Sequence, residues 1–388
     1  MKNVKKINLV YLSAFFGDAL FSPFIALYFI SLGFSDFQRG ILLALIPIST
    51  ILGNFIYGKL SSKLVRNLKL LKMLAMINSL VIIAFGLIKN FYLLLGLTII
   101  FGLNNSPYFS MQDGVGVSFC EKEKKIYSQT RMFGSIGYCA ALLCGSYLVN
   151  LFNYTVIFII SGAFFLLVNI VLLFVKVEAE NNFDEDKKTI SYKNLFRNKL
   201  FVKYIIFYLL LNGMWVIGES YLSTYFNYLD ISDSYYSLMF GIQVGIEVIV
   251  ILLISRIFKK QQHLKYILIV SCVIIASRYL IMGTKIPVNS LIIIVSILRG
   301  LGWGGLLSSH LPVVKKMLGL ELTTKGITFL AILTNLMGTI GNFVAPYIYM
   351  GLSFQWLYLL FGFIQVIGII ILLTINFNFL KKEGENNG

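Results

Sequence analysis

Residues 156–175 read VIFIISGAFFLLVNIVLLFV, an uninterrupted run without a charged side chain. An α-helix rises 1.5 Å per residue, so a run of about 20 residues crosses the roughly 30 Å hydrocarbon core of a bilayer. Other long apolar runs begin at Phe91 and at Leu359. Membrane β-strands are short and alternate apolar with polar residues, which these runs do not. The sequence therefore predicts transmembrane helices.

The rest of the chain follows the same pattern. Of its 388 residues, 58% are hydrophobic and 13% are charged, which is far from the composition of soluble domains. The chain is long enough for about twelve helices of the length that a bilayer requires. We expect spans at residues 7–31, 38–60, 68–88, 91–117, 127–149, 153–175, 200–226, 235–258, 264–284, 288–311, 323–347 and 353–378.

The basic residues predict the orientation of these spans. With both termini cytoplasmic, 27 of the 33 Lys and Arg residues fall on the cytoplasmic side and three on the outer side, and the remaining three lie within spans. Such an excess is typical of cytoplasmic loops. The net charge of +16 is therefore interpreted as orientation and contact with anionic lipid, and no nucleic-acid partner is expected. We predict a multi-pass protein of the plasma (inner) membrane.

A mixed-charge segment divides the chain. Residues 177–199 predict a cytoplasmic linker between an N-terminal six-helix bundle, 1–176, and a C-terminal six-helix bundle with a short cytoplasmic tail, 200–388. The two halves are similar in sequence: YFISLGFSD at 28–36 aligns with YFNYLDISD at 225–233, an offset of 197 residues. The predicted fold class is an all-α membrane protein whose twelve transmembrane helices form two six-helix pseudo-repeats. Repeats of this kind place a solute site near the bilayer midplane.

Two short motifs resemble a known family. The stretch GKLSSKLVR at 58–66 resembles the loop after span 2 in the major facilitator superfamily. The stretch YSQTRMFGSIGY at 127–138 resembles span 5 of the branch with the lactose permease, nucleoside:proton symporters and phenylpropionate permeases. The resemblance covers essentially the whole chain and implies the major facilitator fold. It also implies a cytoplasmic gate loop at Gly58, Lys63 and Arg66, although Ser62 replaces the acid of that signature.

Seven charged residues fall within predicted spans: Asp18, Asp113, Arg131, Glu219, Glu247, Arg278 and Arg299. Each costs roughly 2.5–3.5 kcal/mol on insertion scales, so such residues are paired, hydrated or functional. In a protein with many spans they favour a solute or ion pathway.

Asp113 and Arg131 form the first candidate pair. Both lie about 6 Å from the cytoplasmic ends of spans 4 and 5, and equal depth on consecutive helices suits an ion pair. By resemblance, an arginine at the Arg131 position pairs with an acid at the Asp113 position and contacts the sugar. We expect substrate binding or gating here. The alternative is a structural pair, or an arginine that reaches the interface.

Glu247 and Arg278 form the second candidate pair. They lie deeper, roughly 16 and 21 Å from the cytoplasmic ends of spans 8 and 9, and resemble the acid and the arginine of the branch. A carboxylate in a dry environment takes up a proton when its cationic partner moves away. We therefore assign proton coupling to this pair. A permanent structural bridge is the alternative.

Four further residues complete the candidate binding set. Asp18 and Glu219 lie in spans 1 and 7, the equivalent spans of the two repeats, and could bind a proton, a cation or a polar solute; hydrogen-bonded, protonated carboxyls are the alternative. Arg299 is expected to face a cavity or neutralise an acid. Trp303 could stack on a sugar or base, although core packing is the better explanation for its ring, as for Trp215.

No catalytic site emerges from the sequence. It has no phosphate-binding glycine loop followed by Lys-Ser or Lys-Thr and no cluster of metal ligands, so we expect no enzyme, cofactor or metal. We predict a monomeric secondary active transporter for a sugar, nucleoside or aromatic acid, with proton-coupled uptake by alternating access. The alternatives are proton-coupled efflux of drugs or metabolites, and a non-transporting sensor on the same fold. His310 is expected at the interface.

Overall fold

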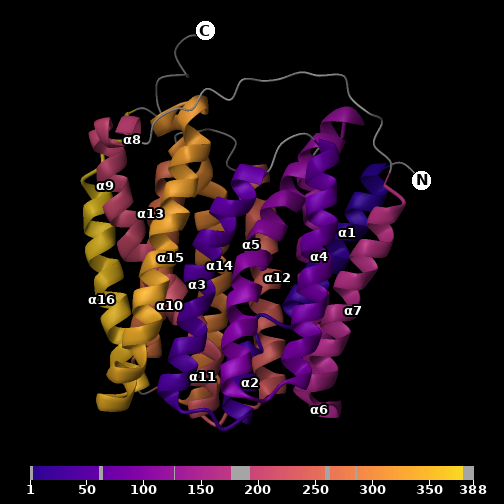
Figure 1. Ribbon diagram of the computed structural model, residues 1–388. Coiled ribbons are helices and arrows are strands. Elements are labelled where there is room, and N and C mark those ends of the chain that lie inside the picture. Colours follow the sequence, from indigo (N-terminus) through magenta and orange to yellow (C-terminus); the bar gives the residue numbers. More distant parts are fainter. Residues whose placement is uncertain are drawn as a thin grey trace. The chain divides into compact units, whose positions relative to one another are not determined.

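The computed structural model describes residues 3–60, 64–125, 127–175, 193–257, 263–284 and 286–378. All regular structure in these ranges is helical, which confirms the all-α fold (Figure 1). The helices before residue 176 are α1 (Asn3–Ala19), α2 (Ile25–Ser31), α3 (Asp36–Leu60), α4 (Leu64–Leu87), α5 (Phe91–Lys122), α6 (Tyr127–Leu151) and α7 (Tyr154–Leu173).

The second half of the chain is more interrupted. Its first helices are α8 (Lys193–Arg197), α9 (Lys199–Tyr208), the π-helix η1 (Leu209–Gly213), α10 (Met214–Ser220) and α11 (Leu222–Tyr228). They are followed by α12 (Asp233–Ile257), α13 (Leu264–Met282), α14 (Val288–Leu318), α15 (Leu320–Gly351) and α16 (Phe354–Leu373).

Each of the twelve predicted spans coincides with one helix or with a run of consecutive helices. Ten helical stretches of the described chain are long and apolar enough to cross a membrane. The other two predicted spans are α5, whose middle carries Asn104 and Asn105, and the first span, which is divided into α1 and α2.

The chain divides into two compact units. The first comprises Met1–Phe183 and Tyr221–Gly241, and the second comprises Asp184–Ser220 and Ile242–Gly388. Tyr221–Gly241 belongs to the first unit because α11 packs on α2, and because the Ser237 hydroxyl donates to the Leu142 carbonyl at 2.7 Å. Most of the predicted linker, 177–199, lies outside the described residues, so its role as the boundary between two bundles stays a prediction.

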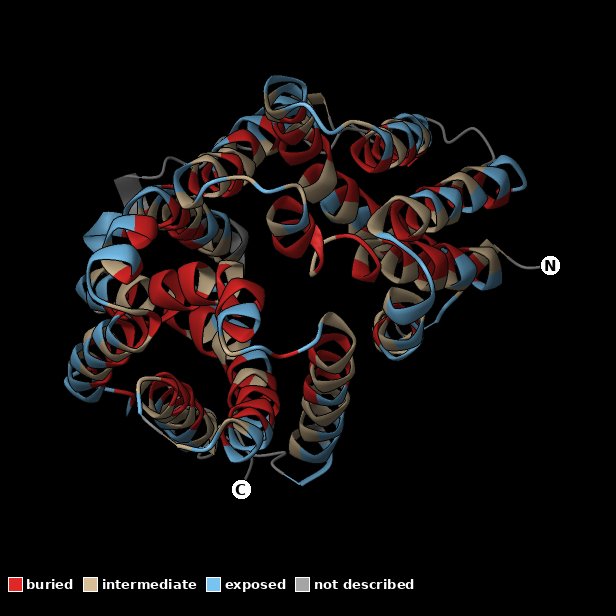
Figure 2. Ribbon diagram, turned by 90° about the horizontal axis from the view of Figure 1, so that it is seen from below, coloured by how far each residue is buried: buried red, intermediate tan, exposed pale blue. Residues whose placement is uncertain are grey.

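Each unit buries the helix faces that meet inside it. Buried residues line these inner faces, and exposed residues lie on the outer faces of the same helices (Figure 2). In the first unit α1 packs between α6 and α7. A Cβ on Gly17 would lie 2.9 Å from the Ser161 carbonyl oxygen, so glycine permits the close approach of α1 to α7.

Spans 1 and 7 are both broken. The amides of Phe21 and Ser22 turn back to the Asp18 carbonyl at 3.0 and 2.8 Å, and α1 ends at Ala19. Pro23 has no N–H, so it cannot donate to the carbonyl of Ala19 and continue the helix. Span 7 contains the π-helix η1 and breaks again between α10 and α11. Irregular backbone at membrane depth occurs where it lines a cavity or is covered by protein.

Candidate functional site

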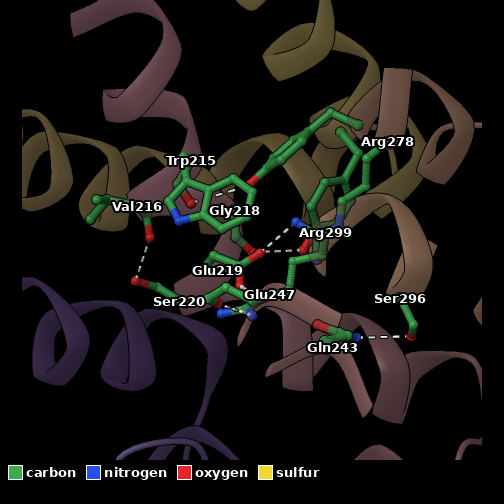
Figure 3. Close-up of polar contacts among 12 residues, drawn as sticks. Trp215, Val216, Gly218, Glu219, Ser220, Gln243, Glu247, Arg278, Ser296 and Arg299 are labelled. Atoms are coloured by element: carbon green, nitrogen blue, oxygen red, sulfur yellow. Dashed lines mark hydrogen bonds and ion pairs between the residues drawn. The ribbon is translucent and has the colours of Figure 1, made fainter. Parts of the chain in front are cut away.

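Four charged side chains meet inside the second unit, one from each of four helices: Glu219 on α10, Glu247 on α12, Arg278 on α13 and Arg299 on α14 (Figure 3). Arg278 Nη1 donates to Glu219 Oε1 at 2.6 Å. Arg299 Nε lies 3.3 Å from Glu219 Oε2, and its Nη1 lies 3.1 Å from Glu247 Oε2. We call this group the four-charge cluster. Its formal charges sum to zero, and Arg299 is shared between the two acids.

Arg278 is the most deeply enclosed member of the cluster. Its side chain is 0% exposed, and its Nε and Nη2 have no hydrogen-bond partner in the described chain. Its guanidinium carbon lies 5.2 Å from the ring centroid of Trp215, a cation–π distance. Removing one partner of a buried pair leaves an uncompensated charge and costs about 3–5 kcal/mol. The position of Arg278 therefore depends on Glu219.

A pair of tryptophans adjoins the cluster. The rings of Trp215 on α10 and Trp303 on α14 stack with centroids 4.4 Å apart and planes inclined by 5°. The Arg299 guanidinium carbon lies 5.8 Å from the Trp215 ring. Trp215 is buried, and Trp303 is partly exposed. The expected role of Trp303 in packing is thus visible, while stacking on a solute stays a prediction.

The backbone of α10 is held by hydrogen bonds from neighbouring helices. The hydroxyl of Tyr279 donates to the Trp215 carbonyl at 3.1 Å, and that of Tyr358 donates to the Gly218 carbonyl at 2.9 Å. A Cβ on Gly218 would lie 2.3 Å from the Tyr279 ring. Only glycine lets α10 approach α13 closely enough to bring Glu219 to Arg278.

The pairing inside the cluster differs from the sequence prediction. Glu247 and Arg278 were expected to pair with each other. In the structure Glu247 pairs with Arg299, and Arg278 pairs with Glu219. The expected pair rested on depth along the helices and on resemblance to the branch, and neither determines which way a side chain points. The expectation that Arg299 faces an acid agrees with its two ion pairs.

Asp18 in the first unit has neutral hydrogen-bond partners. Its Oδ1 accepts from the Ser22 hydroxyl at 2.8 Å and from Asn105 Nδ2 at 3.3 Å. The Asn105 amide oxygen in turn faces Asn78 Nδ2 at 3.4 Å. No ion pair in the described chain involves Asp18. The two asparagines were not among the predicted site residues, although mid-span amides are a signal that could have found them.

Asp113 and Arg131 lie close together but form a loose pair. Arg131 Nε is 3.9 Å from Asp113 Oδ1, and the side chains are 40% and 45% exposed. Asp113 Oδ1 also accepts from the Tyr11 hydroxyl at 2.8 Å, and the guanidinium carbon of Arg131 lies 4.3 Å from the Phe15 ring centroid. An exposed pair of this kind contributes roughly 0–1 kcal/mol. Substrate contact or gating by this pair stays a prediction.

The predicted gate loop is only partly described. Gly58 lies near the end of α3 with open space around it, and Arg66 is exposed on α4. Lys63 lies outside the described residues. The gating role of all three stays a prediction.

His310 has more partners than expected for an interfacial residue. Its Nδ1 lies 2.7 Å from the Tyr204 hydroxyl, and its ring stacks on Tyr208 with centroids 4.5 Å apart. Both tyrosines lie on α9, so His310 joins α14 to α9 within the second unit. In the described residues no group of three or more His, Cys, Asp or Glu side chains could hold a metal ion.

Comparison with known proteins identifies the family. The model described as the MFS_1 like family matches residues 4–360. The chain belongs to the MFS_1 like family. A curated relative of this MFS_1 like protein is "Uncharacterized transporter YwbF" of Bacillus subtilis (strain 168). The two are 24% identical over 361 residues, which is 92% of this chain and 90% of the relative.

Solved structures share the fold of this MFS_1 like chain. The nucleoside transporter NupG has a TM-score of 0.79 and 15% identity, with 97% of this chain and 99% of NupG covered. A POT family transporter in complex with a thioalcohol-conjugated peptide has a TM-score of 0.73 and 13% identity, with 95% of each chain covered. At these identities the likeness shows the fold alone. The chain is thus a multi-pass membrane transporter of the major facilitator type.

Proposed function

We propose that this protein is a secondary active transporter that takes up a small polar solute together with a proton, by alternating access across the plasma (inner) membrane with both termini cytoplasmic. It carries out no covalent chemistry on the solute. The observation that carries the proposal is the shared arginine: Arg299 is in contact with both Glu219 and Glu247. Such an arginine can change partners without leaving the cluster.

Proton coupling follows from this arrangement. While Arg299 contacts Glu247, the carboxylate stays ionised because the cation compensates it. When Arg299 turns to a polar group of the solute or entirely to Glu219, the Glu247 carboxylate is left in a dry environment without its cation, and it takes up a proton. Binding of the solute and binding of the proton are then linked through one side chain. Arg278 keeps Glu219 compensated throughout, because it bonds the other oxygen of that carboxylate.

The stacked tryptophans favour a solute with a planar ring. Trp303 is partly exposed and stacks on Trp215, whose ring lies near the guanidinium groups of Arg278 and Arg299. Ring stacking of this kind contributes about 0.5–1.5 kcal/mol beyond buried area. Among sugars, nucleosides and aromatic acids, this combination favours a nucleoside, and the neighbour NupG is a nucleoside transporter.

The test is alkalinisation of a weakly buffered medium by cells that express the protein. Nucleosides, β-galactosides and aromatic acids are added in separate pulses while the external pH is followed. We expect alkalinisation with nucleosides and its loss in Glu247→Gln. Asp230→Asn is the matched control, because it makes the same chemical change at an exposed turn with φ 58°. Expulsion of a labelled compound without any alkalinisation would contradict uptake and favour efflux. Binding without flux would favour a sensor.

A further inference from the structure

We propose that the break in span 1 holds a binding site for a monovalent metal cation, Na⁺, built around Asp18. The site lies in the first unit, does not involve the four-charge cluster, and does not depend on the proposed proton coupling. It rests on three features of the broken helix and of the side chains that face it.

The first feature is a carboxylate with an unused oxygen. Both hydrogen bonds to Asp18, from Ser22 and from Asn105, end on Oδ1, and Oδ2 accepts none in the described chain. Asp18 is partly exposed. A carboxylate in a membrane span requires a compensating positive charge or a proton. The described ion pairs offer Asp18 no such charge.

The second feature is a set of buried oxygens that lack donors. Asn78 is 0% exposed and its Oδ1 has no partner, while its Nδ2 faces Asn105, which bonds Asp18. Tyr108 is also 0% exposed, with a hydroxyl that has no partner, and it lies one helical turn after Asn105 on α5. Buried polar atoms without partners are rare and point to a water or an ion. Asn78 is linked to the carboxylate through Asn105, and Tyr108 lies on the same helix as Asn105.

The third feature is the backbone. Asp18 lies one residue before the C-terminal end of α1, where the helix dipole is negative and favours a cation. Pro23 has no N–H for the Ala19 carbonyl, so that oxygen lacks its helical donor. In discontinuous membrane helices, half-helix C-terminal ends and unwound carbonyls coordinate Na⁺. The α1 break has the same elements.

The composition of the site favours a monovalent cation. Hard cations take oxygen ligands, and divalent ions are held by several carboxylates. Here one carboxylate stands among neutral amide, hydroxyl and carbonyl oxygens, so the charge matches a single positive ion. A proton on Asp18 would neutralise the carboxyl but would leave the oxygens of Asn78 and Tyr108 without donors. A metal cation balances the carboxylate charge and also binds neutral oxygen ligands, which a single proton does not.

The test is the thermal unfolding of the purified full-length protein in NaCl and in choline chloride, at equal ionic strength and fixed pH. A ligand that binds only the folded state raises the midpoint as its concentration exceeds the dissociation constant. We expect a saturable rise with NaCl and none with choline chloride. Asp18→Asn abolishes the response, and Asn78→Ala raises the half-saturating concentration at least threefold. Glu247→Gln keeps it, so failure of proton coupling and failure of this site are distinguishable.

Two results would overturn the site: equal midpoints in both salts for the unmodified protein, or an Na⁺ response that survives Asp18→Asn. If Asp18→Asn does not fold, Ser22→Ala and Asn78→Ala replace it, and an undiminished response in both has the same meaning. Equilibrium binding of radioactive Na⁺ to the same preparations provides a readout that does not depend on stability.

Discussion

Asp18 in the first unit and Glu219 in the second occupy similar local settings. Each directly follows a glycine, Gly17 or Gly218, that lets its helix approach a neighbour, and each lies one residue before its helix ends. Their partners differ in kind. Glu219 is bonded by two arginines, whereas Asp18 is bonded by a serine and an asparagine.

The difference separates two ways of keeping a carboxylate inside a membrane protein. Glu219 belongs to a cluster that is neutral without any outside ion, so its charge can be redistributed among fixed groups. In the described chain the hydrogen-bond partners of Asp18 are neutral, and the proposed Na⁺ would supply its compensating charge. The second unit is therefore suited to linking proton and solute, and the first to binding a cation.

The largest expected effect comes from removing the carboxylate that is paired with arginines, Glu219. Glu219→Gln leaves the buried Arg278 without the carboxylate of its ion pair and should destabilise the protein by about 3–5 kcal/mol. Asp18→Asn removes no ion pair and should change stability by less than about 1.5 kcal/mol in salt without Na⁺. Thermal unfolding of the two variants in choline chloride measures the contrast.

A double variant provides the control for this contrast. Combining Glu219→Gln with Arg278→Gln removes the charge that the single change leaves unpaired, so part of the lost stability should return. Equal losses of stability in Glu219→Gln and Asp18→Asn would show that pairing with arginines does not set Glu219 apart from Asp18.

Substituting the glycine beside each acid is expected to have a smaller effect on stability. Gly218→Ala drives a Cβ into the Tyr279 ring, and Gly17→Ala drives one toward the Ser161 backbone. Each should cost about 1–3 kcal/mol through overpacking. Gly218→Ala should also slow uptake, because Tyr279 bonds the backbone of α10. Gly96→Ala, which meets open space, is the matched control. The prediction is contradicted if Gly17→Ala and Gly218→Ala both unfold at the same midpoint as the Gly96→Ala control.

Trp303 tests the aromatic contribution of the second unit. Trp303→Ala removes a partly exposed ring and should raise KM for a nucleoside about tenfold, because about 1.4 kcal/mol of stacking corresponds to that factor. Trp303→Phe should restore most of the affinity. Competition by a solute without a ring should be unaffected in both variants. An equal loss for both kinds of solute would assign Trp303 to packing alone.

The smallest effect is expected at the loose pair of the first unit. Asp113→Asn removes an exposed contact at 3.9 Å and should change stability by less than about 1 kcal/mol. Thermal unfolding could instead show a larger loss of stability in Asp113→Asn that the double variant with Arg131→Gln does not show. That result would mean that the pair has a structural role that its exposure does not suggest.

The sequence predicted the helices well and the contacts between them poorly. The apolar runs predicted twelve spans, each of which coincides with one helix or a run of consecutive helices, because bilayer thickness imposes a length that a sequence displays directly. The orientation inferred from the basic residues stays a prediction. The pairing of Glu247 with Arg299 could not be predicted, because it depends on how α12, α13 and α14 are rotated. Depth along the axis had suggested Arg278 instead.

The polar partners of Asp18 were missed for a related reason. Asn78 and Asn105 are far apart in sequence and carry no charge, so neither was identified as a site residue within the long apolar helices. The repeat placed the two acids in equivalent spans but not at equivalent positions, since at the offset of 197 residues Asp18 aligns with Trp215. That each acid lies one residue before a break in its helix is visible only in the structure.

The most direct test of the account uses purified protein in proteoliposomes, with a labelled nucleoside and an imposed pH gradient, acid outside. The unmodified protein should accumulate the nucleoside above equilibrium. Glu247→Gln should exchange nucleoside across the membrane at a comparable rate without accumulating it, because the solute still binds while the proton does not. Accumulation by Glu247→Gln equal to that of the unmodified protein would contradict the assignment of proton coupling to the four-charge cluster.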